Sequence, residues 1–105
     1  MIFPTETNLR IMRLIESQPE ISQRELAKEL GVSLGKVNYC LKALVEKGLV
    51  KAGNFQRHRN KGAYIYCLTP RGVQEKLSLT HEFLRHKLRE YDRIQAEIEQ
   101  LRADL

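Results

Sequence analysis

Apolar residues recur at helical spacing in three segments that precede residue 48 of this 105-residue chain. In the first segment they form one broad face, which predicts a helix whose apolar side lies in the core. We expect Gln18-Pro19 to end this helix and Thr5 or Thr7 to cap its start. The core-facing residues are Leu9, Ile11, Met12, Leu14 and Ile15.

The next two segments form a pair of helices joined by a tight corner. Ser22 and Glu25 have the S-x-x-E spacing in which each side chain bonds the backbone N–H of the other residue, so a helix begins here. Gly31 tolerates the left-handed conformation that closes a helix, and Ser33 offers the next cap. The second helix runs to Lys47, and the pair makes a helix-turn-helix pattern. Its apolar stripe consists of Val37, Cys40, Leu41, Leu44 and Val45.

A hairpin follows the two helices. Residues 49–53 and 63–68 have the composition of short strands, and the segment 54–62 between them is polar, basic and bounded by turn formers. Alternation along the second strand leaves two possible inward faces, of which we favour the one with Tyr66 and Leu68. A basic hairpin after a helix-turn-helix is typical of a wing that contacts phosphates or the minor groove.

A long helix completes the chain. Thr69 can cap it, Pro70 suits its first turn, and no helix breaker occurs after that turn. The sequence therefore predicts a mainly α fold with a small β-hairpin, an α+β arrangement. Residues 1–72 would form a winged helix-turn-helix domain, and residues 73–105 a C-terminal helix for coiled-coil-type dimerisation.

The long helix carries apolar positions at alternating steps of three and four from Val73 to Leu105, which is the a/d seam of a coiled coil. Thr80 and Lys87 interrupt this seam, and only its second half is cleanly apolar. We therefore expect self-association of two copies. The predicted dimerisation residues are Leu84, Tyr91, Ile94, Ile98, Leu101 and Leu105.

The orientation of such a pair stays open from the sequence. Glu97 and Arg102 have the g-to-e spacing that a parallel partner would pair, and an antiparallel arrangement is the alternative. Phe83 and Leu88 lie beside the seam and could pack against the domain instead.

Basic residues gather in the middle of the chain. Lys and Arg against Asp and Glu number four to five in residues 1–32, eight to one in residues 33–72, and six to seven in residues 73–105. A localised excess of this kind attracts a polyanion and releases its counterions on contact. A solvated basic face that keeps the protein soluble would have the same composition.

The exposed side of the second helix in the pair supplies candidate contacts to duplex DNA. Small residues allow close approach to the major groove, and Lys, Asn and Tyr side chains can bond phosphates or base edges. The predicted contacts are Ser33, Gly35, Lys36, Asn38, Tyr39 and Lys42 in the helix, and Arg57, Arg59 and Lys61 in the wing. A winged helix that docks onto another protein is the alternative, against which the basic middle segment argues.

Other classes of function find no support in the residues. The three His and two Cys residues form no nucleophile, acid/base or metal-ligand set, so we expect neither an enzyme nor a cofactor or metal site. The cysteines have no CxxC spacing and are expected to be reduced. Without a signal sequence or an apolar run of membrane-spanning length, the expected location is the cytoplasm and no membrane partner is expected.

Residues 22–72 resemble the winged-helix domain of the MarR family of bacterial transcriptional regulators. The most telling runs are Leu44-Val45-Glu46-Lys47-Gly48-Leu49-Val50 and Leu68-Thr69-Pro70-Arg71-Gly72. The segment from Asn60 to Tyr64 is similar to that of the compact regulators associated with exopolysaccharide gene clusters. The resemblance implies a homodimeric, sequence-specific regulator that binds double-stranded DNA through the candidate residues above.

Two departures from the family pattern affect what the resemblance implies. The usual wing has an Asp and an Arg two residues later, whereas this chain has Asn60 and Gly62 there, so neighbouring basic residues would have to replace that Arg. The longer N-terminal helix of typical members is also absent, which places dimerisation largely on residues 73–105. The chain leaves little room for the cleft that effector-binding relatives use, so a small-molecule effector is not expected.

Overall fold

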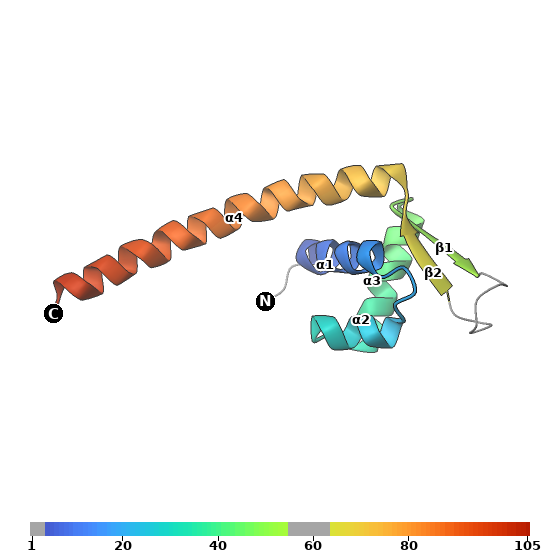
Figure 1. Ribbon diagram of the computed structural model, residues 1–105, viewed down its shortest axis with the longest axis horizontal. Helices are drawn as coiled ribbons and strands as arrows, with labels where there is room; N and C mark the ends of the chain where they lie inside the picture. The colour runs from blue at the N-terminus through green and yellow to red at the C-terminus, as the bar shows by residue number, and fades with distance from the viewer. Residues whose placement is uncertain (1–3, 55–63) are drawn as a thin grey trace.

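The computed structural model describes residues 4–54 and 64–105. Within them, four helices and one hairpin follow each other in the predicted order (Figure 1). This confirms the mainly α fold with a small β-hairpin and a long C-terminal helix. The elements are α1 (Pro4–Ser17), α2 (Gln23–Leu30), α3 (Leu34–Glu46), β1 (Val50–Asn54), β2 (Tyr64–Leu68) and α4 (Pro70–Ala103).

Helix α1 ends before Gln18 as predicted, but its start differs from the prediction. The helix already includes Pro4, a residue suited to a first turn because it has no N–H to leave unpaired. Thr5 and Thr7 therefore lie inside the helix, and neither is its N-cap. The Thr7 side chain is 1% exposed, and its hydroxyl has no hydrogen-bond partner among the described residues.

The predicted caps around α2 and α3 are confirmed. The Glu25 N–H donates to Ser22 Oγ over 3.1 Å, and the Ser22 N–H donates to Glu25 Oε1 over 3.3 Å. Gly31 closes α2 with a φ of +68°. Ser33 caps α3 by accepting the Lys36 N–H over 3.1 Å. Short-range hydrogen bonds of this kind define the corner between the two helices.

The buried stripe of α3 is one residue narrower than predicted. Its core positions are occupied by Val37, Cys40, Leu41 and Leu44, whereas Val45 is 39% exposed. Val45 comes directly after Leu44 and therefore lies at the edge of the stripe, where it is only partly covered.

The start of α4 is bonded to the turn that follows α3. The Thr69 hydroxyl donates to the Gly48 carbonyl oxygen over 2.6 Å and accepts the Gly72 N–H over 3.0 Å, while the Thr69 N–H donates to the Leu49 carbonyl oxygen over 3.1 Å. Gly72 is buried so closely against Leu49 that a Cβ atom there would lie 2.0 Å from the Leu49 carbonyl oxygen. The two sequence runs that carry the family resemblance are thus in contact with each other.

Strands β1 and β2 pair antiparallel, from Val50 opposite Leu68 to Asn54 opposite Tyr64. Strand β1 begins at Val50, one residue later than predicted, because the Leu49 N–H bonds the Leu44 carbonyl oxygen in the turn that ends α3. Tyr66 is buried and Leu68 packs against the core, which confirms the predicted inward face.

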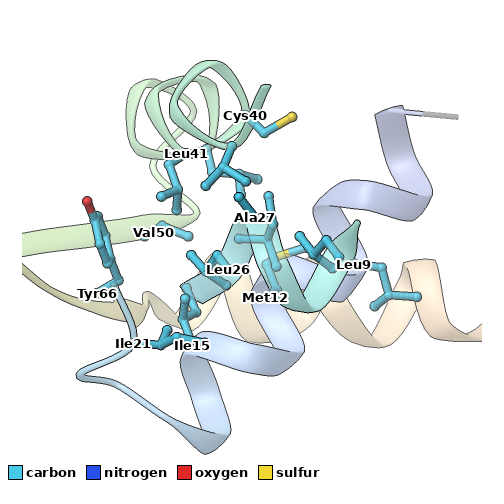
Figure 2. Close-up of a cluster of buried hydrophobic side chains, with 14 of the residues drawn as sticks. Leu9, Met12, Ile15, Ile21, Leu26, Ala27, Cys40, Leu41, Val50 and Tyr66 are labelled. Carbon is cyan, nitrogen blue, oxygen red and sulfur yellow. The ribbon is translucent and has the colours of Figure 1, made fainter. Parts of the chain in front are cut away.

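One core joins α1, α2, α3, the hairpin and the first turns of α4 (Figure 2). Helix α1 lies between α2 and α4, so its broad apolar face is covered from several sides (Figure 1). The residues labelled in Figure 2 are Leu9, Met12, Ile15, Ile21, Leu26, Ala27, Cys40, Leu41, Val50 and Tyr66.

Helix α4 packs on α1 only through its first half. Leu79 is buried in the core, Phe83 packs against it, and Lys76 forms an ion pair with Glu16 of α1. Leu88 is 53% exposed, so of the two residues beside the seam only Phe83 packs on the domain. From residue 84 onward every residue of the helix is exposed, and this part projects away from the other elements (Figure 1).

Candidate nucleic-acid interface

Helix α3 presents one polar, solvent-exposed face. Gly35, Asn38, Tyr39 and Lys42 follow the i, i+3, i+4, i+7 spacing of a single helix face, and all four are exposed. Tyr39 has the largest free side chain, with 76% of its surface exposed. A Cβ added at Gly35 would meet only Ser33 Oγ, at 4.0 Å, so the backbone is open to a close approach at this point.

The other two predicted helix contacts lie at the start of α3, with Ser33 as its N-cap and Lys36 in its first turn. The Ser33 hydroxyl already accepts the Lys36 N–H as the helix cap, although its own proton can still be donated. Lys36 is half-buried and lies near Cys40. Burial raises the pKa of the Cys40 thiol more than the Lys36 charge lowers it, so Cys40 is a neutral packing residue rather than a reactive thiolate.

Gln23, the first residue of α2, connects the exposed face to the hairpin. Asn38 Nδ2 donates to Gln23 Oε1 over 3.3 Å, and Gln23 Nε2 donates to the Tyr66 hydroxyl over 3.0 Å. One amide therefore bridges α3 and β2. We did not predict this role for Gln23, because its partners lie 15 and 43 residues away and no local pattern indicates them.

The hairpin packs beside α1 and α2 through β2. The Tyr66 N–H donates to the Pro19 carbonyl oxygen over 3.4 Å, which attaches the strand to the connection between these helices. The predicted wing contacts Arg57, Arg59 and Lys61 lie outside the described residues.

Several general properties of the described part bear on the chemistry. Residues 4–54 and 64–105 contain no group of three or more His, Cys, Asp or Glu side chains that could hold a metal ion. Over the same ranges, no helix has the length and apolar character needed to cross a membrane. The exposed face of α3 instead combines a cation, an amide, a phenol and a glycine, which suit the major groove of duplex DNA.

Residues 4–51 match the family model described as winged helix-turn-helix DNA-binding. The HTH-type transcriptional regulator Ptr1 of Methanocaldococcus jannaschii is 33% identical over 88 residues, which make up 83% of this chain and 57% of Ptr1. An uncharacterised protein of the same organism is 30% identical over 73 residues, which are 70% of this chain and 25% of that protein. The chain thus spans between a quarter and somewhat over half of the length of these curated relatives.

Solved structures show the same fold. The MepR–DNA complex of S. aureus superposes with a TM-score of 0.72 at 22% identity, covering 95% of this chain and 72% of MepR. A protein described as a MarR family transcription regulator superposes with a TM-score of 0.64 at 18% identity, covering 94% of this chain and 72% of that one. At these identities the likeness concerns the fold.

A helix-turn-helix, a two-stranded hairpin and a long C-terminal helix in this order define the class. The chain has the winged helix-turn-helix fold of DNA-binding regulators. Within that class its fold is that of the MarR-family transcriptional regulators, which confirms the resemblance carried by residues 22–72.

Proposed function

We propose that this protein is a sequence-specific regulator of transcription that binds double-stranded DNA as a homodimer. The observation that carries the proposal is the exposed face of α3, where Gly35, Asn38, Tyr39 and Lys42 are accessible together. In a helix-turn-helix the second helix enters the major groove, and these residue types can bond base edges or phosphates there. MepR, which shares the fold, is described in a complex with DNA, and this supports a DNA-binding function for the chain.

The remaining parts of the proposal rest on the predictions made from the sequence. Residues 1–72 serve as the DNA-binding unit, with Ser33 and Lys36 at the start of α3 and the basic wing residues Arg57, Arg59 and Lys61 on the phosphates. The protein acts in the cytoplasm without a small-molecule effector, and its targets are genes related to exopolysaccharide.

The homodimer is proposed from the apolar seam of α4. This seam lies in residues 73–105. The predicted dimerisation residues are all exposed in the single chain, which leaves an apolar stripe, interrupted by Lys87, without cover. Exposed apolar stripes on a protein surface are typical of interaction sites. The stripe consists of Leu84, Tyr91, Ile94, Ile98, Leu101 and Leu105.

Selection of bound sequences from a random pool of duplex DNA tests the function directly. We expect a palindrome whose half-sites are about one helical turn apart, the spacing of a two-fold symmetric reader. Lys36→Ala and Tyr39→Ala should each reduce the preference for that site over random duplex by about tenfold, because a good base contact contributes ~1–3 kcal/mol.

Two controls accompany this experiment. Lys47→Ala removes the same charge as Lys36→Ala beyond the end of α3 and should leave the preference unchanged. Arg59→Ala should weaken binding to all duplexes similarly. If Lys36→Ala and Tyr39→Ala keep the preference intact, α3 is not the reading helix. Binding to random duplex that does not weaken with added salt would favour a protein-docking module instead.

A further inference from the structure

A groove of about 800 Å³ runs between α1 and the first half of α4. Its floor is apolar, with Leu9 from α1 and Val73, Leu77 and Leu84 from α4, and Arg10 and Arg13 lie along one side. We propose that the distal segment of α4, residues 89–105, of a second copy fills this groove, so that the two α4 helices pair antiparallel. This inference rests on the homodimer proposed above and adds its geometry.

The shape of the chain favours this occupant. The groove is bounded by two helices, so a fitting occupant is a third helix that does not already pack on other elements of its own chain. The distal segment meets this condition, because each of its residues is exposed and it projects from the domain (Figure 1). The first half of the partner's α4 is a poorer occupant, because its own α1 already packs beside it. In a parallel pair, that α1 would have to lie at the groove as well.

The seams of two copies can pair antiparallel so that each seam residue of one helix faces a seam residue of the other. With the two-fold axis at residue 89, every a position of one helix lies opposite a d position of the other, as packing in layers requires. The apolar residues of the partner's distal segment then lie against the groove of the first copy. The facing pairs are Val73 with Leu105, Leu77 with Leu101, Thr80 with Ile98, Leu84 with Ile94, and Lys87 with Tyr91.

Lys87 distinguishes the two orientations. It occupies a d position, so a parallel pair would place it against its own copy in the seam, where two like charges repel. In the antiparallel pair it faces Tyr91, whose ring can accept the cation on its face. Lys87 Nζ also lies 3.4 Å from Glu90 Oε2 of its own chain, which partly neutralises the ammonium group.

The charge of α4 is also asymmetric along its length. Lys and Arg outnumber Asp and Glu by four to two in residues 70–88, whereas acidic residues outnumber basic ones by five to three in residues 89–105. On the α1 side of the groove, Arg10 and Arg13 are balanced by Glu6 and Glu16, so its basic excess comes from Lys76 and Lys87 of α4. An antiparallel pair brings each acidic half against a basic half, whereas a parallel pair brings like halves together.

Disulfide crosslinking tests the orientation in the full chain. In a Cys67→Ser background, which removes the exposed thiol and leaves the buried Cys40 in place, we introduce Leu84→Cys and Ile94→Cys, singly and together. Both positions are about half exposed in the single chain, so folding should be unaffected. The double variant should form about tenfold more covalent dimer than either single variant, because only facing cysteines meet the geometry of a disulfide.

The outcomes separate this inference from the homodimer itself. In the antiparallel pair, equal positions are ten residues apart along the axis, about 15 Å, too far for a disulfide. Efficient crosslinking of Leu84→Cys alone or Ile94→Cys alone would therefore overturn the antiparallel pairing while leaving the dimer intact. A chain that sediments as a monomer at all concentrations would overturn both. The Cys67→Ser parent should give no covalent dimer.

Discussion

Gly72 has less room for a side chain than Gly31, Gly35 or Gly48. A methyl group there would lie 2.0 Å from the Leu49 carbonyl oxygen, which is itself held by the Thr69 N–H. Since backbone atoms cannot move aside easily, we expect Gly72→Ala to lower the free energy of unfolding by at least about 1–3 kcal/mol. Urea unfolding followed by circular dichroism would measure this change.

Gly35 provides the matched control for that substitution. A Cβ at Gly35 meets nothing closer than Ser33 Oγ at 4.0 Å, so Gly35→Ala should leave the free energy of unfolding unchanged or raise it by up to ~1 kcal/mol through helix propensity. An equal loss of stability in both variants would mean that the contact between Gly72 and Leu49 does not limit the packing of α4.

Residue-scale features could be predicted where they depend on near neighbours in the sequence. The caps Ser22, Ser33 and Thr69 each bond a backbone N–H three residues ahead, and the sequence predicts all three. The contact of Gly72 with Leu49 crosses 23 residues of chain, and no local pattern contains it.

At the scale of elements, α2, α3 and the hairpin are held in position by side-chain hydrogen bonds as well as by the core. Gln23→Ala removes both bonds of the bridge between Asn38 and Tyr66. We expect the free energy of unfolding to fall by about 1 kcal/mol. The preference for the selected DNA site should also fall, because the Asn38 amide loses the partner that orients it.

The matched control for this bridge is Glu29→Ala, at an exposed position of the same helix. It should change the free energy of unfolding by less than about 0.5 kcal/mol and leave the site preference unaltered. Site selection that is the same for Gln23→Ala and for the unaltered protein would show that Asn38 is positioned by α3 alone.

The sequence predicts the existence and type of each element, but not which face of α4 lies against the domain. Its seam, including Leu77 and Leu84, is exposed, and the helix packs on α1 through the neighbouring stripe with Leu79 and Phe83. Both stripes have helical periodicity, so periodicity alone does not decide between them. The packed face is the one that brings Gly72 into close contact with Leu49, a contact far apart in the sequence.

The molecule as a whole is elongated, with extents of 64 × 26 × 20 Å. The compact part holds the helix-turn-helix and the hairpin, and the distal segment of α4 extends from it with its apolar residues uncovered (Figure 1). The order of motifs predicts this arrangement, because a helix of more than thirty residues is too long for one face of so small a core. The homodimer proposed above would bury its apolar stripe against a second chain.

Ile98→Asp is the substitution that tests this requirement for the whole molecule. Ile98 is 43% exposed in the single chain and lies in the part of α4, from residue 84 onward, where every residue is exposed, so the domain should remain folded. In a dimer, each copy would lose an apolar contact of ~1.5–3 kcal/mol and place a carboxylate in the seam. We expect the dimer dissociation constant to rise at least about 100-fold, measured by sedimentation equilibrium.

Ala96→Asp adds the same charge at an f position on the opposite side of the helix and should leave the constant nearly unchanged. DNA binding by the Ile98→Asp protein should weaken toward that of a single half-site, because two linked readers bind with a high effective concentration. A dimer as tight as that of the unaltered protein would show that the chains associate through a surface other than the seam of α4.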